Sequence, residues 1–414
     1  MSNYSVLIDG YNLRLPKGSG IKYYTISLIE ALEKKSVDVS LLFDYSLESR
    51  YNEIIEIEFI EKYYKGEIKL NKKDLIKSLI KFNFSPQIFK VSDSIKDYEN
   101  KFLKNKKIVN IRNIYTFQEI ASRFNFLVNL NVKDIDIFHS TYMLNISFQN
   151  TKRITTIHDL IPLKLPHTTL DDKKVFFNKV KKAIEISDKI VTISEHSKKD
   201  ILEFFDVPEE KVINCYQSIT LPKELLDFNF SVKKFDLEKN EYFLFVGNIE
   251  PKKNVGRVIQ AFLNIDTDKK LVIVGKKAWL WEDLLKGSEK AIKKGKIILL
   301  DYVSREDLIA LYQNAFGFIF PSLYEGFGLP PLEAMACKCP VITSNVSSLP
   351  EVCGDAAIYC DPYSILSIQN AMEKLLNMNE SERKKLMSKG LKRVEFFNED
   401  EYAKRILNVY ESVL

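Results

Sequence analysis

Residues 315–335 read Ala-Phe-Gly-Phe-Ile-Phe-Pro-Ser-Leu-Tyr-Glu-Gly-Phe-Gly-Leu-Pro-Pro-Leu-Glu-Ala-Met, and this stretch decides the fold class. Its first part, Ala315 to Phe320, is an apolar run of strand length, which is typical of a buried parallel strand. A turn with two glycines follows, and Pro331 suits the first position of a helix that we expect from Leu332 to Lys338. A strand, a glycine-rich turn and a helix in this order predict one βα unit of a parallel sheet.

Two carboxylates, Glu325 and Glu333, flank this turn. The glycines and the Pro330-Pro331 pair rule out one continuous helix between them, so the two acids must sit on different elements. Free N–H groups at the start of the helix favour a phosphate. We expect Glu325, at the carboxyl end of the strand, to accept from sugar hydroxyls and Glu333, in the first helical turn, to accept from a ribose. The stretch therefore predicts a nucleotide-sugar site.

The rest of the chain repeats the βα pattern in two halves. The first half opens with a strand from Ser5 to Asp9, a loop with Gly18 and Gly20, and a helix that begins near Ile21. Further strands are expected at Val39–Phe43, Ile137–His139, Ile154–Ile157, Lys189–Ile193 and Lys211–Tyr216. The segment from about Tyr45 to Leu130 carries no pattern from which elements can be assigned.

The second half begins after a polar connector at Ser231 to Asn240. Strands are expected at Tyr242–Val246 and Lys270–Val274, and Asn254 is expected to cap the helix between them. Ser304 with Asp307 predicts a capping box for a later helix. Alternating strands and helices in both halves predict an α/β protein with two doubly wound, Rossmann-like domains facing each other across a cleft. We assign residues 1–230 and 231–397 to these domains, with 398–414 as an amphipathic final helix.

Length and composition exclude several classes of protein. A chain of 414 residues exceeds one ordinary core, which agrees with two domains. No apolar stretch reaches the ~20 residues that cross a bilayer, and Met1 to Gly10 is typical of a strand, not of a signal peptide. We therefore expect a cytoplasmic protein. The five cysteines match no common zinc spacing, and we interpret them as core residues.

The segment from Glu61 to Lys133 is basic and aromatic, with 16 Lys and Arg against 7 Asp and Glu. Aromatic residues alternate with the lysines, and two interpretations stay open. Either the aromatics form core and the lysines a solvated face, or the segment contacts an anionic membrane surface or a phosphate-bearing lipid. No nucleic-acid motif accompanies the charge, so we expect no nucleic-acid partner. The aromatic residues are Tyr63, Tyr64, Phe82, Phe84, Phe89, Phe102, Phe117, Phe124 and Phe126.

The two acids, eight positions apart with seven residues between them and set around Pro-Ser-x-Tyr-Glu-Gly-Phe-Gly-Leu-Pro, closely resemble the Glu-x7-Glu signature of retaining glycosyltransferases of family 4. The run from Pro340 to Val352 resembles the same family. The resemblance implies the GT-B fold, in which the final helix crosses back to the first domain. It also implies transfer of a hexose from a nucleotide-diphosphate sugar to a glycan or lipid-linked acceptor, commonly in bacterial surface-polysaccharide synthesis and often from GDP-mannose.

The resemblance assigns roles to residues outside this signature. Gly247 to Asn254 resembles a family turn whose basic side chains meet the donor pyrophosphate, and Lys253 matches the family lysine. The family commonly has an arginine where this chain has Asn248, so Lys252 is the candidate substitute. His158, in Ile154 to Pro162, matches a histidine beside the donor sugar, and His139 matches a second, more weakly characteristic pattern.

The predicted catalytic residues are thus Glu325, Lys253 and His158. The remaining predicted site residues share a role in donor binding: Glu333, Lys252, Gly18, Gly20, Gly247, Gly326, Phe327, Gly328 and Leu329. Asp134 and Asp136 have the spacing of a metal-binding pair, but we interpret them as the solvated start of a strand. We expect the lysines and the helix start to stabilise the diphosphate without metal or cofactor. The alternative function is a non-catalytic nucleotide-sugar sensor or partner subunit, and an epimerase fits the signature poorly.

Overall fold

A computed structural model describes residues 4–15, 20–49, 51–66, 85–93, 100–219, 221 and 223–414. The first half of the chain builds one eight-stranded sheet. Seven of its strands run parallel, and β3 at the edge is antiparallel to β4. In spatial order the strands are β10 (Val212–Asn214), β9 (Lys189–Thr192), β8 (Lys152–Thr156), β6 (Ile137–Ser140), β1 (Ser5–Asp9), β2 (Asp38–Phe43), β4 (Lys107–Asn110) and β3 (Gln87–Lys90). Strands β5 (Val128–Leu130) and β7 (Ile146–Phe148) form a separate parallel pair.

The second half builds a six-stranded, entirely parallel sheet. Its strands are β13 (Ile297–Leu300), β12 (Lys270–Val274), β11 (Tyr242–Val246), β14 (Gly317–Phe320), β15 (Val341–Ser344) and β16 (Ala357–Cys360). The chain starts at β11, moves outward to β13, returns to β14 beside β11 and then moves outward the other way. The point where the strand order reverses therefore lies between β11 and β14, and ligands of such sheets bind outside the carboxyl ends of the strands at this point.

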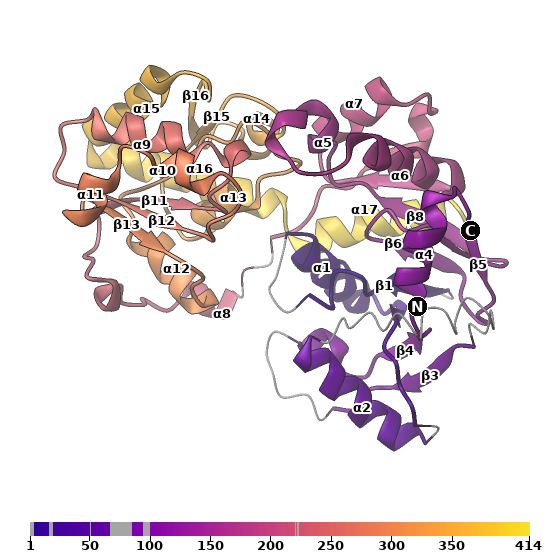
Figure 1. Ribbon diagram of the computed structural model, residues 1–414. Coiled ribbons are helices and arrows are strands. Elements are labelled where there is room, and N and C mark those ends of the chain that lie inside the picture. The colour runs from indigo at the N-terminus through magenta and orange to yellow at the C-terminus, as the bar shows by residue number, and fades with distance from the viewer. Residues whose placement is uncertain are drawn as a thin grey trace.

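Helices connect the strands in each half, as Figure 1 shows. Those of the first half are α1 (Gly20–Lys34), α2 (Asn52–Lys65), α4 (Ile114–Arg123), α5 (Ile161–Lys164), α6 (Lys173–Ile186), α7 (Glu195–Phe204) and α8 (Lys223–Leu226). Those of the second half are α9 (Val255–Leu263), α10 (Trp281–Leu285), α11 (Glu289–Lys293), α12 (Arg305–Asn314), α13 (Leu329–Ala336), α14 (Leu349–Cys353), α15 (Ile365–Asn377) and α16 (Glu380–Phe396).

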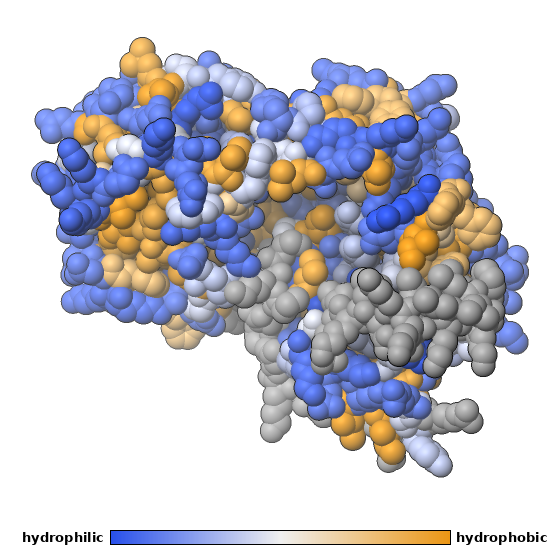
Figure 2. All heavy atoms as spheres, in the orientation of Figure 1, coloured by the Kyte–Doolittle hydropathy of each residue, from blue (hydrophilic) through white to orange (hydrophobic). Residues whose placement is uncertain are grey.

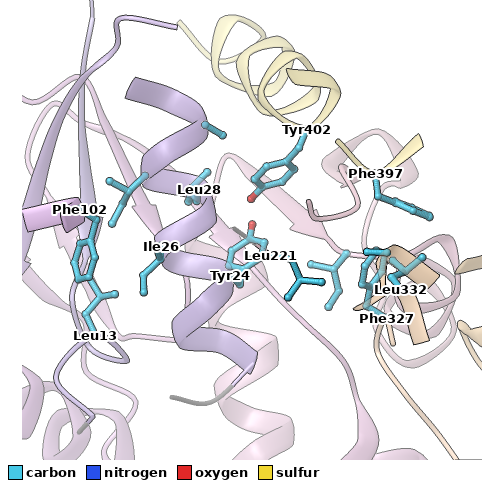
Figure 3. Packing of buried hydrophobic residues seen from close by; sticks show 14 of the residues in the cluster. Leu13, Tyr24, Ile26, Leu28, Phe102, Leu221, Phe327, Leu332, Phe397 and Tyr402 are labelled. Carbon is cyan, nitrogen blue, oxygen red and sulfur yellow. The ribbon is translucent and has the colours of Figure 1, made fainter. Parts of the chain in front are cut away.

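The last helix, α17 (Glu399–Glu411), lies in the other half of the molecule from the helix that precedes it (Figure 1). It packs on α1: the rings of Tyr402 and Tyr24 are 6.1 Å apart, and their hydroxyls point toward one another in Figure 3. The Tyr410 hydroxyl of the same helix forms a hydrogen bond with Nδ1 of His139 in the first sheet. The expected return of the final helix to the first domain is confirmed, whereas the exact boundaries at 230 and 397 stay predictions.

One hydrophobic core continues from the first half into the second. Figure 3 shows the junction, where Tyr24 and Leu221 of the first half approach Phe327 and Leu332 of the second. Phe397, at the end of α16, contacts Phe327 edge-on with ring centroids 5.2 Å apart. Because this apolar contact includes the turn that carries Glu325, the core itself fixes the position of the turn.

Two local predictions in the second half were wrong in detail. Helix α13 begins at Leu329, with both prolines in its first turn, and ends before Lys338. Early prolines are tolerated because the N–H groups of the first turn have no partner within the helix, and Lys338 has a positive φ of 57°, which ends the helix. Asn254 also does not cap α9 with its side chain. Its amide donates instead to the carbonyls of Pro321 and Pro362, which ties this turn to the neighbouring strand ends.

The aromatic residues of the basic segment are partly buried and partly exposed, and membrane contact stays a prediction. Tyr63, Phe89, Phe102 and Phe117 are core residues, which agrees with the first interpretation. Tyr64, Phe124 and Phe126 are exposed, by 80% for Phe124 and 60% for Phe126. Phe82 and Phe84 lie outside the described residues. All five cysteines are free and buried. Within the described part of the chain, no helix is both long and apolar enough to span a membrane.

Candidate active site

The predicted donor residues gather at the point where the strand order of the second sheet reverses. The turn after β11 carries Gly247, Lys252 and Lys253, the last two in a short 3-10 helix, Pro251–Lys253. The turn after β14 carries Glu325. The amide of Leu323 donates to the carbonyl of Lys252 at 2.9 Å, so the two turns are joined directly. Phosphate-binding loops of doubly wound sheets occupy this position.

Lys253 and Glu325 form the central ion pair of the site. The Lys253 ammonium lies 2.6 Å from Glu325 Oε1 and 5.0 Å from the centre of the Phe320 ring. The Ser322 hydroxyl donates to the same carboxylate oxygen at 2.6 Å. Both charged side chains are mostly buried, at 16% and 12% exposed. Opposite charges that are fixed this close together can each engage a ligand with little reorganisation.

Two serines after β15 hold the main chain around Glu325. The Glu325 amide donates to the Ser347 hydroxyl at 3.1 Å. The Ser348 hydroxyl bridges the carbonyls of Glu325 and Phe327, at 2.9 and 2.8 Å. These serines belong to the run from Pro340 to Val352 that resembles the family. Their hydrogen bonds explain why the run from Pro340 to Val352 accompanies the Glu-Gly-Phe-Gly turn, because this run fixes the main chain of the turn.

Lys252 lies in a cluster of acids. Its ammonium is 3.5 Å from Glu250 Oε1. Burial alone would lower the pKa of Lys252, but Glu250, Glu325 and Asp159 outweigh burial and raise the pKa above its usual value. Burial raises the pKa of Asp159, and Lys252 opposes that rise. The ammonium of Lys252 is therefore charged at neutral pH and faces the same space as Lys253.

Glu333 lies one helical turn further from the loop than expected, in the second turn of α13. Its carboxylate is 3.4 Å from the Arg305 guanidinium and accepts a 3.3 Å hydrogen bond from the Tyr312 hydroxyl. Arg305 also lies over the Tyr23 ring of α1, with the guanidinium carbon 5.2 Å from its centroid. Tyr23 of α1 and Glu333 thus contact the same arginine, and Gly20 is the first residue of α1. Gly18 lies outside the described residues.

Three of the predicted donor residues have their side chains in the core or have no side chain. Phe327 is 2% exposed and its ring lies in the core, so a donor can meet only its backbone. Gly328 precedes α13 with φ at 111°, where a Cβ would also come within 2.7 Å of the Leu349 side chain. Leu329 begins the helix and packs against the core.

His158 lies at the carboxyl end of β8, facing the same turn from the first half. Its Nε2 is 3.0 Å from the Thr141 carbonyl, and its ring meets Tyr24 edge-on at 4.7 Å. Burial lowers the pKa of His158 to about 4, which the contact with Thr141 only partly offsets. The imidazole is therefore neutral at physiological pH. A neutral ring that donates through Nε2 to a carbonyl suits positioning better than proton transfer.

The remaining histidine and the other acids considered from the sequence make hydrogen bonds that stabilise the fold. His139 is fully buried between the Tyr410 hydroxyl at 2.7 Å and the Thr156 hydroxyl at 2.8 Å, away from the donor turns. Asp136 accepts from the amide and the hydroxyl of Ser5 at the start of β1. Asp159 accepts from the Ile161 amide at 3.0 Å, as a turn cap. Within the described ranges, no group of three or more His, Cys, Asp and Glu residues could hold a metal ion.

Contacts between the two halves at the site involve residues that sequence reasoning missed. The Gly326 carbonyl accepts from the hydroxyls of Ser194 at 2.7 Å and Ser197 at 3.2 Å, at the start of α7. The Glu351 carboxylate accepts from the amides of Glu195 and His196 at 2.7 and 3.1 Å. Serines before a helix and a lone glutamate are common in any α/β chain, and nothing local indicates that they meet across 130 to 160 residues.

A hydrogen bond to a buried carboxylate also joins the halves nearby. The Tyr324 hydroxyl donates to the buried Asp200 carboxylate, which also pairs with Lys164 at 2.7 Å. The His196 ring lies 5.2 Å from the Tyr324 ring. The residue before Glu325 is therefore anchored in the first half, while Glu325 itself points to Lys253 of the second.

Comparison with known proteins identifies the family of the second half of the chain. Residues 227–393 match the family described as glycosyl transferases group 1. O-antigen chain mannosyltransferase B of Escherichia coli is 31% identical over 268 residues, which cover 63% of this chain and 70% of that protein. Serotype-specific mannosyltransferase WbdA of Escherichia coli is 32% identical over 238 residues, or 54% of this chain but only 29% of that longer protein.

A solved structure extends the likeness of fold to the whole chain. Anabaena HepE in complex with UDP-glucose superposes with a TM-score of 0.63 over 99% of both chains, at 12% identity. Such low identity concerns the fold alone. The arrangement of two Rossmann-like domains predicted from the sequence is confirmed as the GT-B fold.

Proposed function

We propose, since the chain belongs to the glycosyl transferases of group 1, that it transfers mannose from a nucleotide-diphosphate donor to a growing surface polysaccharide. The two relatives above are named as mannosyltransferases, and one acts on the O-antigen chain, which supports the sugar and the class of product. GDP-mannose is the favoured donor. The acceptor is a glycan or a lipid-linked oligosaccharide, and the reaction would take place in the cytoplasm, at the inner face of the membrane.

The Lys253–Glu325 pair is the observation that carries the proposal. In the absence of a donor these two charges neutralise one another at 2.6 Å. A donor that enters between the turns after β11 and β14 would divide the pair. Lys253 would turn to the pyrophosphate and Glu325 would accept from the sugar hydroxyls. The attraction of Lys253 for the leaving diphosphate grows as the glycosidic bond breaks, so this contact would lower the barrier and not only bind the ground state.

The nucleoside would lie toward Glu333. Its carboxylate is held by Arg305 and Tyr312 with one face toward α1, which supports a hydrogen bond to a ribose hydroxyl. Lys252 would add a second positive charge at the diphosphate. It would thereby replace the arginine that the family commonly has at the position of Asn248. Two lysines and the start of α13 supply the positive charge without a metal ion. We therefore propose metal-independent transfer.

His158 would position the sugar. A neutral imidazole with Nε2 bound to the Thr141 carbonyl can orient a neighbouring hydroxyl and does not act as a base at neutral pH. No other ionisable base is required if the acceptor attacks from the side on which the diphosphate leaves, because the departing phosphate oxygen can take the proton. This route keeps the configuration of the anomeric carbon, so we propose that the enzyme is retaining.

Four measurements test the proposal. Thermal unfolding with GDP-mannose, UDP-glucose and dTDP-glucose should show a clear stabilisation by one of them, about 2.7 kcal/mol at ~100 times its dissociation constant. The same donor should be hydrolysed slowly without acceptor, and NMR of the freed sugar should show the donor's own anomer first. Tight binding without turnover would instead favour a nucleotide-sugar sensor. Loss of activity in EDTA would contradict the metal-independent route.

A further inference from the structure

A fully buried carboxylate at the end of β1, that of Asp9, takes no part in the mechanism above. The buried Asp44, which follows β2, pairs with Arg14 at 2.6 Å, whereas Asp9 pairs with no basic side chain among the residues that the structure describes. A buried charge without an opposite charge is costly to a fold, and such groups gather at functional sites. Substrates in the recess between the two halves, which Figure 2 shows, do not contact this carboxylate because it has no exposed surface. Any role in the reaction must therefore pass through a neighbouring residue.

The neighbour that Asp9 holds most firmly is Thr141, the residue after β6. Asp9 Oδ2 accepts from the Thr141 amide and, at 2.9 Å, from the Thr141 hydroxyl. Strands β1 and β6 are parallel neighbours with Ile8 opposite His139, so their carboxyl ends lie side by side. Because the carboxylate binds both the main chain and the side chain of Thr141, it also fixes the direction of the carbonyl of that residue.

The Thr141 carbonyl in turn fixes the imidazole of His158. Nε2 of His158 lies 3.0 Å from this oxygen, and a carbonyl only accepts, so Nε2 carries the proton. Nδ1 is then an acceptor, and it has no hydrogen-bond partner among the described residues. The bond to Thr141 therefore determines that His158 meets a ligand as an acceptor, through Nδ1.

The same carboxylate holds the chain that leads to α1. Asp9 Oδ1 accepts from the Tyr11 amide at 3.1 Å, where the loop before α1 begins. Thr25 of α1 places its hydroxyl 3.0 Å from the Thr141 hydroxyl. Asp9 therefore contacts the start of this loop and the residue that holds His158, and it keeps the two in register.

Asp9 is mostly ionised at neutral pH. Burial raises the pKa of Asp9 to about 6, although the hydrogen bonds that it accepts and the charge of Arg153 oppose that rise. An ionised carboxylate accepts stronger hydrogen bonds than a neutral one and cannot donate, so the Thr141 hydroxyl must point to it. Arg153 of β8 donates to the carbonyl of Leu144 at 2.7 Å and to that of Ile146. The segment after β6 is thus held at its start by Asp9 and at its end by Arg153.

We propose that Asp9 is a positioning residue of the transferase: through Thr141 it holds His158 with Nε2 protonated, so that Nδ1 accepts from a hydroxyl of the donor sugar. The part that concerns the sugar rests on the proposed function. The orientation and the tautomer of His158 in the free protein do not depend on a donor, however, so the two proposals can fail separately.

NMR of the histidine side chains tests the orientation without any donor. The chain has four histidines, so 15N-labelled histidine gives few signals, and His158→Ala identifies those of His158. We expect the parent protein to show the Nε2–H tautomer of His158 alone. Asp9→Asn and Thr141→Val should each add about one tenth or more of the Nδ1–H tautomer, because the Thr141 carbonyl is no longer held in one direction.

Two variants of the same half are the matched controls. Asp44→Asn removes a buried carboxylate whose partner is Arg14, and Thr155→Val removes a buried hydroxyl that contacts Ser187 at 2.8 Å. Both should leave the signals of His158 unchanged. A single Nε2–H tautomer in both Asp9→Asn and Thr141→Val, or the same mixture in the controls, would overturn the proposal.

Kinetics in two backgrounds tests whether Asp9 acts through the histidine. We expect Asp9→Asn to lower kcat about tenfold and to change the KM of the nucleotide sugar less than about twofold, because the second half holds the nucleotide. In the His158→Ala background the same substitution should change kcat less than about twofold, since the group that Asp9 positions is absent. Equal losses in both backgrounds would make Asp9 a structural residue and overturn the proposal.

The design separates this proposal from the proposed function. If Asp9→Asn does not fold, Thr141→Val replaces it in both experiments, because valine keeps the amide and the carbonyl of residue 141. If the parent protein turns over no nucleotide sugar, the proposed function fails, and the tautomer of His158 in the free protein still decides whether Asp9 positions the ring.

Discussion

The backbone of Gly326 lies directly against the carbonyl of His158, so close that a Cβ on residue 326 would come within 2.6 Å of that oxygen. These residues belong to different halves of the chain, one in the turn that carries Glu325 and the other at the end of β8. Their approach brings the predicted sugar-positioning histidine to the predicted donor-binding acid. The glycine is required here by the close approach of two backbones.

We expect Gly326→Ala to reduce kcat/KM about 100-fold, because the added methyl must push apart the two groups that we propose to meet the donor sugar. Steady-state kinetics with thermal unfolding checks this. Gly287→Asn is the matched control, since Gly287 has φ at 86° with open space around it and asparagine tolerates this backbone region. Near-native turnover by Gly326→Ala would mean that the observed approach of the two halves is not needed for catalysis.

Removal of either charge of the central pair should weaken the enzyme. For Lys253→Ala and Glu325→Gln we expect kcat/KM to fall about 10- to 150-fold, equivalent to 1.5–3 kcal/mol for a charge-assisted contact. Lys290→Ala, on the exposed face of α11, should retain native activity. If both active-site variants kept near-native turnover, the assignment of the donor site would be wrong.

The same pair predicts non-additive effects on stability. Each single variant leaves a mostly buried charge without its partner, whereas Lys253→Met combined with Glu325→Gln leaves neither. We therefore expect the double variant to lose less free energy of unfolding than the two single variants together, by about 0.5–3 kcal/mol. Urea unfolding of the four proteins measures this coupling, and exact additivity would contradict the ion pair.

Acid should destabilise the protein partly through His139. Burial lowers the pKa of His139 to about 3, and the neighbouring His158 and Arg153 act in the same direction. Between pH 6.5 and about 3 the unfolded chain therefore binds a proton that the native protein does not, so this histidine contributes stability above pH 6.5 that is lost as the pH falls. The slope per proton is about 1.4 kcal/mol per pH unit.

His139→Gln isolates this contribution, because glutamine offers a donor and an acceptor to Tyr410 and Thr156 but does not titrate. We expect the loss of stability between pH 6.5 and 4.5 to be less steep in the variant, by up to ~1.4 kcal/mol per pH unit. Asp9, whose pKa burial raises to about 6, acts in the opposite direction. Asp9 is present in both proteins, so its contribution to the pH dependence of stability cancels when the two slopes are compared. Equal slopes would contradict a proton-free His139 in the native state.

The sequence predicted the parts of the fold that depend on local apolar patterns. The strands Ser5–Asp9, Tyr242–Val246 and Lys270–Val274 were placed residue for residue, because each has an apolar centre of at least three consecutive residues that is buried on both faces. The start of α13 was misplaced by three residues, since proline is compatible with any position of the first turn and so does not fix the helix start. The segment from Tyr45 to Leu130 could not be interpreted. Its elements are stabilised by aromatic contacts, such as Phe43 with Phe59, between residues that no motif links.

In the candidate site too, residues within motifs were predicted and residues outside motifs were missed. Lys253 and Glu325 were assigned to the donor from two separate motifs, and the structure brings their side chains to 2.6 Å from one another. Arg305 was missed, because an arginine at a helix start is ordinary until the fold brings it to Glu333. Residues whose role depends on a contact between the two halves carry no local signal, and Ser194, Ser197 and Glu351 are of this kind.

The Glu351 carboxylate joins the halves by accepting from two amides at the start of α7, where it also faces the positive end of the helix dipole. Glu351→Gln keeps an acceptor but removes the charge, so we expect a loss of about 0.5–2 kcal/mol in the contact between the halves. Because this contact holds the Gly326 turn against β8, kcat/KM should fall about two- to thirtyfold. Glu289→Gln, at the start of α11 within one half, removes a similar charge and should have no effect on turnover. Small-angle scattering of Glu351→Gln should show a larger radius of gyration than the parent protein, and an unchanged radius with unchanged kinetics would show that Glu351 does not hold the halves together.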